Sequence, residues 1–144
     1  MIAIDTNLLV YAFRRGLPEH HPAQQALEKA MADPDGWGFA YSCLAEFWSV
    51  VTHAAAVGGA ANAKRTAEFV DSLCHDGGAQ IWFPGPGFIA RLCQLAVDQN
   101  VCGGAIFDLQ IALMAFDHGA SELWTHDPGF RSIAGLRVVD PLTD

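Results

Sequence analysis

Short apolar runs alternate with longer amphipathic segments along this chain. The apolar runs have the length and composition of buried strands and cover residues 1–4, 37–41, 80–83, 122–125 and 136–139. The segments between them repeat apolar side chains every three or four residues, the period of a helix, over residues 8–13, 20–33, 43–57, 62–75, 88–99 and 105–118. Strands that alternate with helices form βαβ units, so the pattern predicts an α/β fold with a mainly parallel sheet.

Turn residues separate these elements without dividing the chain. The stretch 33–36 is a turn, Gly58-Gly59 ends a helix, and Ser42 is a candidate N-cap for the helix that follows the second strand. With 144 residues, 51% of them hydrophobic, the chain can bury one sizeable core. We therefore expect a single domain over residues 1–144.

The composition narrows the possible functions. The chain carries eight Lys and Arg residues against 16 Asp and Glu residues, which gives a net charge of −8. Proteins that coat nucleic acid by charge alone need clustered Lys and Arg, so the composition excludes this class. The surplus of acid either keeps the protein soluble or includes carboxylates that hold a divalent cation.

Membrane spans, secretory signals and disulfide frameworks are not predicted. No run approaches the roughly 18 to 20 uncharged apolar residues of a membrane helix, and the first residues lack a basic stretch. We therefore expect a cytoplasmic protein that is not bound to a membrane. Cysteines without metal-ligand spacing are most simply small buried hydrophobic residues in such a protein. They are Cys43, Cys74, Cys93 and Cys102.

Four acidic residues lie where strands end or where the following helices begin. Asp5 follows the first strand, and Asp127 follows the fourth. Glu46 lies near the start of the helix after the second strand, and Asp108 lies early in the helix that begins at residue 105. In a parallel sheet, the carboxyl ends of the strands and the starts of the following helices share one edge. We therefore expect the four carboxylates to point into one small volume.

This cluster predicts metal-assisted hydrolysis of a phosphoester. Neighbouring carboxylates repel one another, and their pKa values rise unless a cation compensates. Ligation by Asp and Glu oxygens suits Mg²⁺ or Mn²⁺, which keep several waters and bind substrate phosphates. A metal-bound water is a better source of hydroxide, and the metal stabilises charge that builds on a phosphoryl oxygen.

Each acid also has a simpler explanation when it is taken alone. Asp5 could cap the next helix, Asp108 could interact with a helix dipole, and Asp127 could be a turn residue. Glu46 could be a solvated surface residue. The shared placement of the four residues favours a common site. His126 is a possible general base, although a metal-bound water does not require one.

Four motifs occur in a familiar order. They are Ile4-Asp5-Thr6-Asn7, Glu46 after Tyr41-Ser42, Asp108 within Phe107-Asp108-Leu109-Gln110, and Thr125-His126-Asp127-Pro128-Gly129-Phe130, with a closing stretch at 136–141. Together they resemble the PIN-domain family, and in particular its VapC-type toxins. The resemblance implies a three-layer α/β/α sandwich on a five-stranded, mainly parallel sheet. It also implies an endonucleolytic ribonuclease that depends on Mg²⁺ or Mn²⁺.

The resemblance also assigns roles to individual residues. The implied catalytic and metal-binding acids are Asp5, Glu46, Asp108 and Asp127. The implied supporting residues are Thr6, Asn7 and Thr125. His126 stands where members of the family more often have Asn or Arg, which alters the surroundings of the fourth acid without removing an acid.

The resemblance further implies partners. Toxins of this kind usually form homodimers, and a cognate antitoxin inserts into the groove over the active site. The acidity of this chain is consistent with a basic segment docking there. The implied substrates are structured RNAs, frequently transfer RNA or ribosomal RNA. The candidate phosphate contacts are Arg14, Arg15, Lys64 and Arg65.

Two other functions remain open from the sequence. An aspartyl-phosphate phosphatase also begins with an acid after its first strand, but it needs a second Asp where this chain has Asn7. It also needs a lysine, and the only lysines are Lys29 and Lys64. The other alternative is a non-catalytic PIN-like module that holds RNA or protein, which the presence of all four acids disfavours.

Overall fold

The computed structural model of this chain describes residues 1–143. Within them, one sheet of five parallel strands forms the centre of the molecule. The strands are β1 (Ile2–Ile4), β2 (Trp37–Ala40), β3 (Gln80–Trp82), β4 (Glu122–Trp124) and β5 (Arg137–Val139). They lie in the order β3-β2-β1-β4-β5, so the first strand of the chain is the central strand of the sheet. The predicted parallel α/β architecture is confirmed.

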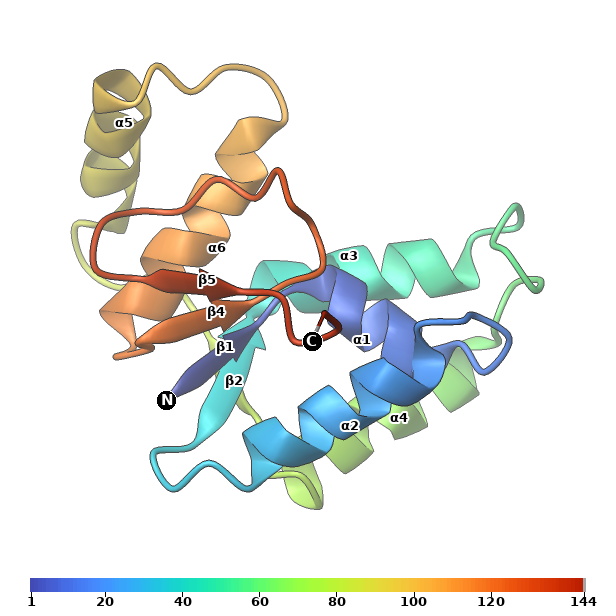
Figure 1. Cartoon of the computed structure of the whole chain (residues 1–144). Coiled ribbons are helices and arrows are strands. Elements are labelled where there is room, and N and C mark those ends of the chain that lie inside the picture. Colours follow the sequence, from blue (N-terminus) through green and yellow to red (C-terminus); the bar gives the residue numbers. More distant parts are fainter. Residues whose placement is uncertain (144) are drawn as a thin grey trace.

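Helices in the described residues connect the strands and cover both faces of the sheet. They are α1 (Thr6–Phe13), α2 (His20–Met31), α3 (Tyr41–Thr52), α4 (Ala63–His75), α5 (Phe88–Asp98) and α6 (Ala105–Asp117). The crossovers through α1–α2 and α3–α4 step one way across the sheet, and the crossover through α5–α6 steps back. Because such crossovers are right-handed, α1 to α4 cover one face and α5 and α6 cover the other (Figure 1). The fold is therefore a three-layer α/β/α sandwich.

The core forms where the central strands are apolar on both faces. Every residue of β1 and of β2 is buried, as expected for parallel strands that carry helices on both sides. Large side chains from all three layers fill the space between the sheet and the helices. The largest include Trp37, Phe39, Phe47, Leu109 and Leu123, each less than 2% exposed.

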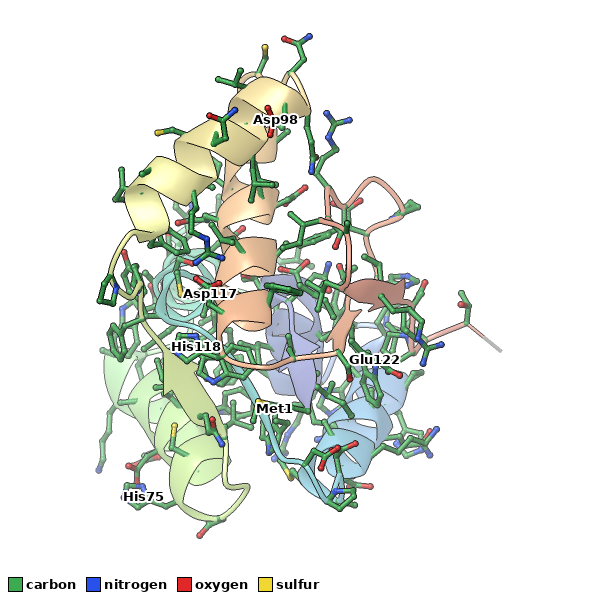
Figure 2. The ribbon with its side chains drawn as sticks, turned by 90° about the vertical axis from the view of Figure 1, so that its left-hand side faces the viewer. Met1, His75, Asp98, Asp117, His118 and Glu122 are labelled. Carbon is green, nitrogen blue, oxygen red and sulfur yellow. The ribbon has the colours of Figure 1, made fainter. Side chains whose placement is uncertain are left out.

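Helices α5 and α6 run in opposite directions. Asp98 and Asp117, the last residues of the two helices, lie at opposite ends of the pair (Figure 2). Arg91 of α5 donates a hydrogen bond to Asp117 at 2.9 Å and ties the two helices together. The chain then enters β4 at Glu122, on the side of the molecule that holds Met1 (Figure 2). Helix α6 consequently begins at the opposite edge of the sheet, where the strands end.

The start of α3 differs from its prediction. The helix begins at Tyr41, directly after β2, and its N-cap is Ala40. Ser42 is therefore not the cap, because it already lies inside the first turn of the helix. The strand leads into the helix without an intervening loop, which moves the boundary two residues earlier than the sequence predicts.

The end of α3 also comes earlier than predicted. The apolar pattern continues to Val57, but the helix ends at Thr52 because His53 adopts extended dihedrals (φ −64°, ψ 140°). Near this end, the carbonyl oxygen of Val51 accepts a hydrogen bond from the Arg14 guanidinium at 2.7 Å. A contact from a distant part of the chain thus satisfies a carbonyl that a longer helix would have used.

Some side chains face a different way from the predicted pattern. Thr66 is fully buried in α4 while its neighbour Ala67 is exposed, because the Thr66 hydroxyl donates to the Asn62 carbonyl at 2.9 Å. Phe116, one of the apolar residues from which the helix over 105–118 is predicted, is 43% exposed rather than buried in the core. The cysteines are free, but only one is fully buried: Cys43 is buried, Cys74 half-buried, and Cys93 and Cys102 exposed. None of the described helices is both long enough and apolar enough to cross a membrane.

Candidate active site

Asp5 lies where β1 leads into α1. It is the N-cap of α1, with extended dihedrals (φ −81°, ψ 158°), and its Oδ1 accepts a hydrogen bond from the Thr6 backbone N–H at 2.7 Å. The simpler explanation of Asp5 as a helix cap is therefore correct. It does not compete with a functional role, since the residue is only 8% exposed and its second oxygen, Oδ2, binds other polar groups.

Two polar side chains hold the second oxygen of Asp5. The Thr125 hydroxyl donates to Oδ2 at 2.7 Å, and the Asn7 side-chain amide donates to it at 3.2 Å. The same amide donates to the Thr125 hydroxyl at 2.9 Å, and Asn7 Oδ1 accepts from the His126 backbone N–H at 3.3 Å. These contacts tie the start of α1 to the loop after β4. They fix the orientation of the Asp5 carboxylate.

Glu46 reaches the same site from α3. The Thr6 hydroxyl donates a hydrogen bond to Glu46 Oε2 at 3.0 Å, while the Thr6 backbone N–H donates to Asp5. One residue therefore orients two of the four acids and links α1 to α3. Glu46 itself is exposed, in contrast with the buried Asp5.

Asp108 and Asp127 are held by backbone N–H groups of the loop after β4. Asp127 Oδ1 accepts from the Gly129 N–H at 2.8 Å, so this residue does organise a turn, as its simpler explanation states. Asp108 Oδ2 accepts from the Arg131 N–H at 3.2 Å, which packs the loop against the first turns of α6. The Asp127 N–H donates to the Thr125 hydroxyl at 3.1 Å. The loop thus connects these two acids to the residue that binds Asp5.

The four acids line one cleft of about 430 Å³ at the carboxyl edge of the sheet, which we call the acid cleft: they are Asp5, Glu46, Asp108 and Asp127. Tyr11, Val50 and Phe107 form its apolar walls. The convergence predicted from the strand ends is confirmed. Among residues 1–143, no three Asp, Glu, His or Cys side chains are close enough to form a ready metal-binding group. The four carboxylates therefore line one cleft without converging on a single metal-binding position.

The fold and the acid cleft can be compared with known proteins. Residues 2–136 match the family model of the PIN domain. This chain belongs to the PIN-domain family. It is 32% identical to ribonuclease VapC43 of Mycobacterium tuberculosis over 142 residues, which covers 99% of this chain and 96% of that protein. It is 24% identical to ribonuclease VapC48 of the same organism over 139 residues, which covers 96% of each chain.

Solved PIN-domain structures share the fold. The chain superposes on VapC20 of Mycobacterium tuberculosis, described as a Sarcin-Ricin loop cleaving toxin, with a TM-score of 0.67 at 12% identity, over 90% of this chain and 92% of that one. It superposes on VapBC2 from Rickettsia felis, solved with a DNA fragment from the promoter, with a TM-score of 0.63 at 19% identity, over 96% and 98% of the two chains. The three-layer PIN fold inferred from the sequence is confirmed.

Burial dominates the electrostatics of Asp5 in this PIN domain. Loss of water around the carboxyl group raises its pKa from an ordinary value of 3.8 to about 6. Hydrogen bonds from Thr125 and Thr6 oppose this rise, whereas the negative charges of Glu46 and Asp108 add to it. The first acid of the site is therefore partly protonated at mildly acidic pH when nothing compensates its charge.

Asp108 experiences the same two effects more weakly. Burial raises its pKa, the hydrogen bond from the Arg131 N–H lowers it, and the negative charges of Asp127 and Glu46 raise it further. Repulsion from Glu46 therefore acts on both Asp5 and Asp108. Neighbouring negative charges therefore raise the pKa of Asp5 and that of Asp108.

The raised pKa of Asp5 predicts a pH-dependent stability. Its folded-state pKa (about 6) exceeds the ordinary value of 3.8, so the carboxyl group stays protonated to a higher pH in the folded state than in the unfolded state. The metal-free protein should therefore lose stability relative to the Asp5→Asn variant as the pH rises from about 4 to about 6, by up to about 3 kcal/mol, and the difference should stay constant above that range. Urea unfolding of both proteins at pH 4 to 7.5 measures it.

The control for this experiment is Asp98→Asn, which replaces an exposed acid at the end of α5. The free energy of unfolding of Asp98→Asn should differ from that of the wild type by the same amount at pH 4 and at pH 6. A hydrogen bond lost in Asp5→Asn shifts the difference equally at every pH and leaves its slope unchanged. If the stability advantage of Asp5→Asn over the wild type instead becomes smaller as the pH rises, Asp5 ionises more easily in the folded state than in the unfolded state.

His126 does not belong to the acid cleft. Its Nδ1 lies 2.8 Å from Asp140 Oδ2, and its ring makes an edge-on contact with Tyr11 at 6.0 Å between centroids. Asp140 was assigned no role from the sequence, although it lies in the closing stretch that carries part of the family resemblance. The pair joins the loop after β4 to the end of β5 and so supports the loop that carries Asp127.

The four basic candidates do not lie at the acid cleft. Arg14, Arg15 and Arg65 line a separate cleft of about 540 Å³ at the far end of α1, which we call the arginine cleft. Arg14 is engaged there, since its guanidinium donates to the carbonyls of Val51 and Gly59 at 2.7 Å each. Lys64 lies 3.9 Å from Glu68 and does not line this cleft. The structure therefore separates Lys64 from the three arginines.

Proposed function

We propose that this chain is a metal-dependent endoribonuclease and the toxin of a toxin–antitoxin pair. One observation carries the proposal: in a PIN domain, four carboxylates from separate parts of the chain line a single cleft at the sheet edge. The similar proteins VapC43 and VapC48 are named ribonucleases, and the similarity extends over almost the whole chain. We assign the hydrolysis of an RNA phosphodiester bond to the acid cleft.

The acid cleft has the donor chemistry that Mg²⁺ or Mn²⁺ prefers. The charged side chains that line it are carboxylates, the oxygen donors that these ions prefer, and a bound cation would relieve the repulsion that helps to raise the pKa of Asp5 to about 6. The residues that would hold the ion are Asp5, Glu46, Asp108 and Asp127. When bound, such an ion stabilises charge on a phosphoryl oxygen and lowers the pKa of water.

The polar residues around the acids act by positioning them. Thr125 and Asn7 hold one oxygen of Asp5, and the Thr6 N–H holds the other, so the carboxylate cannot rotate freely. The Thr6 hydroxyl orients Glu46 in the same way. Groups that are already oriented need little rearrangement when a substrate binds, which is the main way in which a rigid site lowers a reaction barrier.

We also propose that a cognate antitoxin covers the acid cleft and that two copies of the chain form a dimer. The fold shared with VapBC2 supports an antitoxin partner. The net charge of −8 and the acids of the cleft favour a basic docking segment, since complementary charge speeds association and excludes wrong partners.

The RNA backbone is proposed to extend from the acid cleft toward the arginine cleft. Helix α1 joins the two clefts, and its eight residues span roughly 12 Å from Asp5. Arg15 and Arg65 are the best placed of the candidate phosphate contacts, because Arg14 binds two carbonyls and Lys64 lies beside Glu68. These contacts would add affinity without reading the base sequence.

The test is cleavage of RNA by the purified protein with and without a divalent cation. We expect cuts at few positions in total RNA with Mg²⁺ or Mn²⁺, no cuts in excess chelator, and full recovery when the cation is returned. Mapping the new RNA ends identifies the sites. Cleavage that persists in chelator would contradict the metal-dependent mechanism, and tight RNA binding without cleavage would favour the non-catalytic module.

A further inference from the structure

Asp108 is held less firmly than Asp5. Both oxygens of Asp5 accept hydrogen bonds, from Thr6 at one oxygen and from Thr125 at the other. Asp108 is half-buried, and among residues 1–143 its carboxylate accepts one hydrogen bond, from the Arg131 N–H to Oδ2 at 3.2 Å. The orientation of this acid therefore depends on how firmly the fold holds Arg131.

Arg131 lies in the loop that joins β4 to β5, over residues 125–136, a stretch with neither helix nor strand. A loop of this length loses conformational entropy when it keeps one shape, so it needs contacts with rigid elements. Thr125 supplies such a contact at the Asp5 end of the loop. At the Asp108 end, the contact comes from α5.

Gln99, the C-cap of α5, makes two contacts with this loop. Its backbone carbonyl accepts a hydrogen bond from the Arg131 guanidinium at 3.2 Å, and its side-chain amide donates to the Ser132 carbonyl at 3.3 Å. The guanidinium also brings positive charge to the carbonyl end of a helix, where it is favoured. Two successive loop residues are thus fixed to one residue of α5. We call Gln99 and Arg131 the α5 clamp.

The end of α5 is a rigid support for the clamp. Asn100 has a left-handed backbone (φ 48°), the only non-glycine residue within 1–143 that does. Its N–H donates to the Val97 carbonyl at 3.1 Å, and the Val101 N–H donates to the Ala96 carbonyl at 2.8 Å. These two bonds form a Schellman motif, which satisfies carbonyls of the last helical turn. The C-cap carbonyl lies outside the motif, and the guanidinium of the clamp supplies its donor.

The side chain and the backbone of Arg131 do different things. Burial raises the pKa of Asp108, the Arg131 N–H lowers it, and the charges that act on this carboxyl group are those of Asp127 and Glu46. The guanidinium is exposed and binds the helix end. The side chain therefore fixes the loop, while the backbone N–H reaches the acid.

We propose that Gln99 and Arg131 are positioning residues that hold Asp108 in the orientation in which its other oxygen, Oδ1, binds the divalent cation. This inference rests on the proposed metal-dependent function and adds the residues that orient one of its acids. A carboxylate that is already oriented loses less freedom when an ion binds, so hydrogen bonds behind metal ligands raise metal affinity.

Titration calorimetry of Mn²⁺ into the protein without RNA tests the clamp. We expect Gln99→Ala and Arg131→Ala each to weaken Mn²⁺ binding by about 2- to 12-fold, as loss of one hydrogen bond does. Charge alone predicts the opposite for Arg131→Ala, because removing a positive charge should strengthen cation binding. The controls are Gln94→Ala, an exposed glutamine of α5, and Lys29→Ala, an exposed positive charge on α2. Both should bind Mn²⁺ within about twofold of the wild type.

Further variants separate positioning from contact with RNA. Arg131→Lys keeps a cation that can donate to the same carbonyl and should restore Mn²⁺ affinity to within about twofold of the wild type. The double variant Gln99→Ala/Arg131→Ala should lose less than the product of the two single losses, because both changes release the same loop. Excess Mg²⁺ should restore RNA cleavage by Arg131→Ala, since the loss lies in cation affinity.

Two results would overturn the proposal. One is wild-type Mn²⁺ affinity in both Gln99→Ala and Arg131→Ala. The other is a higher KM for RNA in Arg131→Ala with unchanged Mn²⁺ affinity, which would make the guanidinium a phosphate contact instead.

Hydrogen exchange of the Arg131 backbone amide, followed by NMR in the metal-free protein, does not depend on catalysis. We expect this amide to exchange about 2- to 12-fold faster in Gln99→Ala than in the wild type, and at the wild-type rate in Gln94→Ala. If the wild type binds no Mn²⁺ and cuts no RNA but the amide exchanges faster in Gln99→Ala, the metal-dependent function fails while the hold on Asp108 stands. If Mn²⁺ binds and the exchange rate is unchanged, the clamp is overturned.

Discussion

Replacing Asp5 with Asn will lower the rate of RNA cleavage by about 10³-fold, and Asp108→Asn will have a similar effect. Each change removes one negative oxygen from the acid cleft and leaves the size of the side chain almost unchanged. The expected loss is large because these carboxylates are the groups proposed to hold the divalent cation. Initial rates with Mg²⁺, on an RNA whose cleavage site has been mapped, measure the effect.

Asp98→Asn is the matched control for this prediction, since it removes an exposed carboxylate that does not line the acid cleft. It should cleave within about twofold of the wild-type rate. Asp5→Asn should also unfold at the wild-type temperature or above it at pH 7, because the buried charge that raises the pKa of Asp5 to about 6 is gone. Wild-type cleavage by Asp5→Asn and by Asp108→Asn would exclude the acid cleft as the catalytic site.

Replacing Gly38 with Ala will destabilise the fold by about 3 kcal/mol or more. Gly38 lies in β2 and pairs with Gln80 of β3. A Cβ atom at this position would lie 2.3 Å from the Gln80 carbonyl oxygen and 2.8 Å from the ring of the buried Trp82. Neither neighbour can move aside without opening the contact between the two strands. Urea unfolding at pH 7 measures the loss.

Gly16→Ala is the control for the strand substitution. No heavy atom lies within 4 Å of a Cβ built at Gly16, so its effect should stay within about 0.5 kcal/mol. Equal stability of Gly38→Ala and Gly16→Ala would mean that β2 and β3 separate at little cost. Because β2 leads directly into α3, the destabilised variant should also cleave RNA more slowly at temperatures near its unfolding transition.

Much of the acid cleft was predictable, because its position follows from the topology rather than from particular contacts. Parallel strands end at one edge, so an acid after β1, an acid after β4 and acids early in α3 and α6 must lie near one another. The cap and turn explanations of Asp5 and Asp127 also proved correct. A carboxylate can cap a helix with one oxygen and still present the other to a site.

The errors arose where a local pattern competes with a distant contact. The apolar period of α3 continues beyond its last turn, but Arg14 binds the Val51 carbonyl where the helix ends. Thr66 is buried because its hydroxyl has a partner within its own helix, which a count of apolar positions overlooks. Ser42 has the residue type of a cap, yet the strand leads into the helix before it.

Periodicity and residue order were enough to determine the alternation of strands and helices, the parallel sheet and the edge at which the acids gather. These follow from steric and topological rules that act along the chain. Only the tertiary structure decided how deeply Asp5 is buried and which hydroxyl holds it. Such properties depend on contacts between residues far apart in sequence, as in the hydrogen bond from Thr125 to Asp5, and no local pattern encodes them.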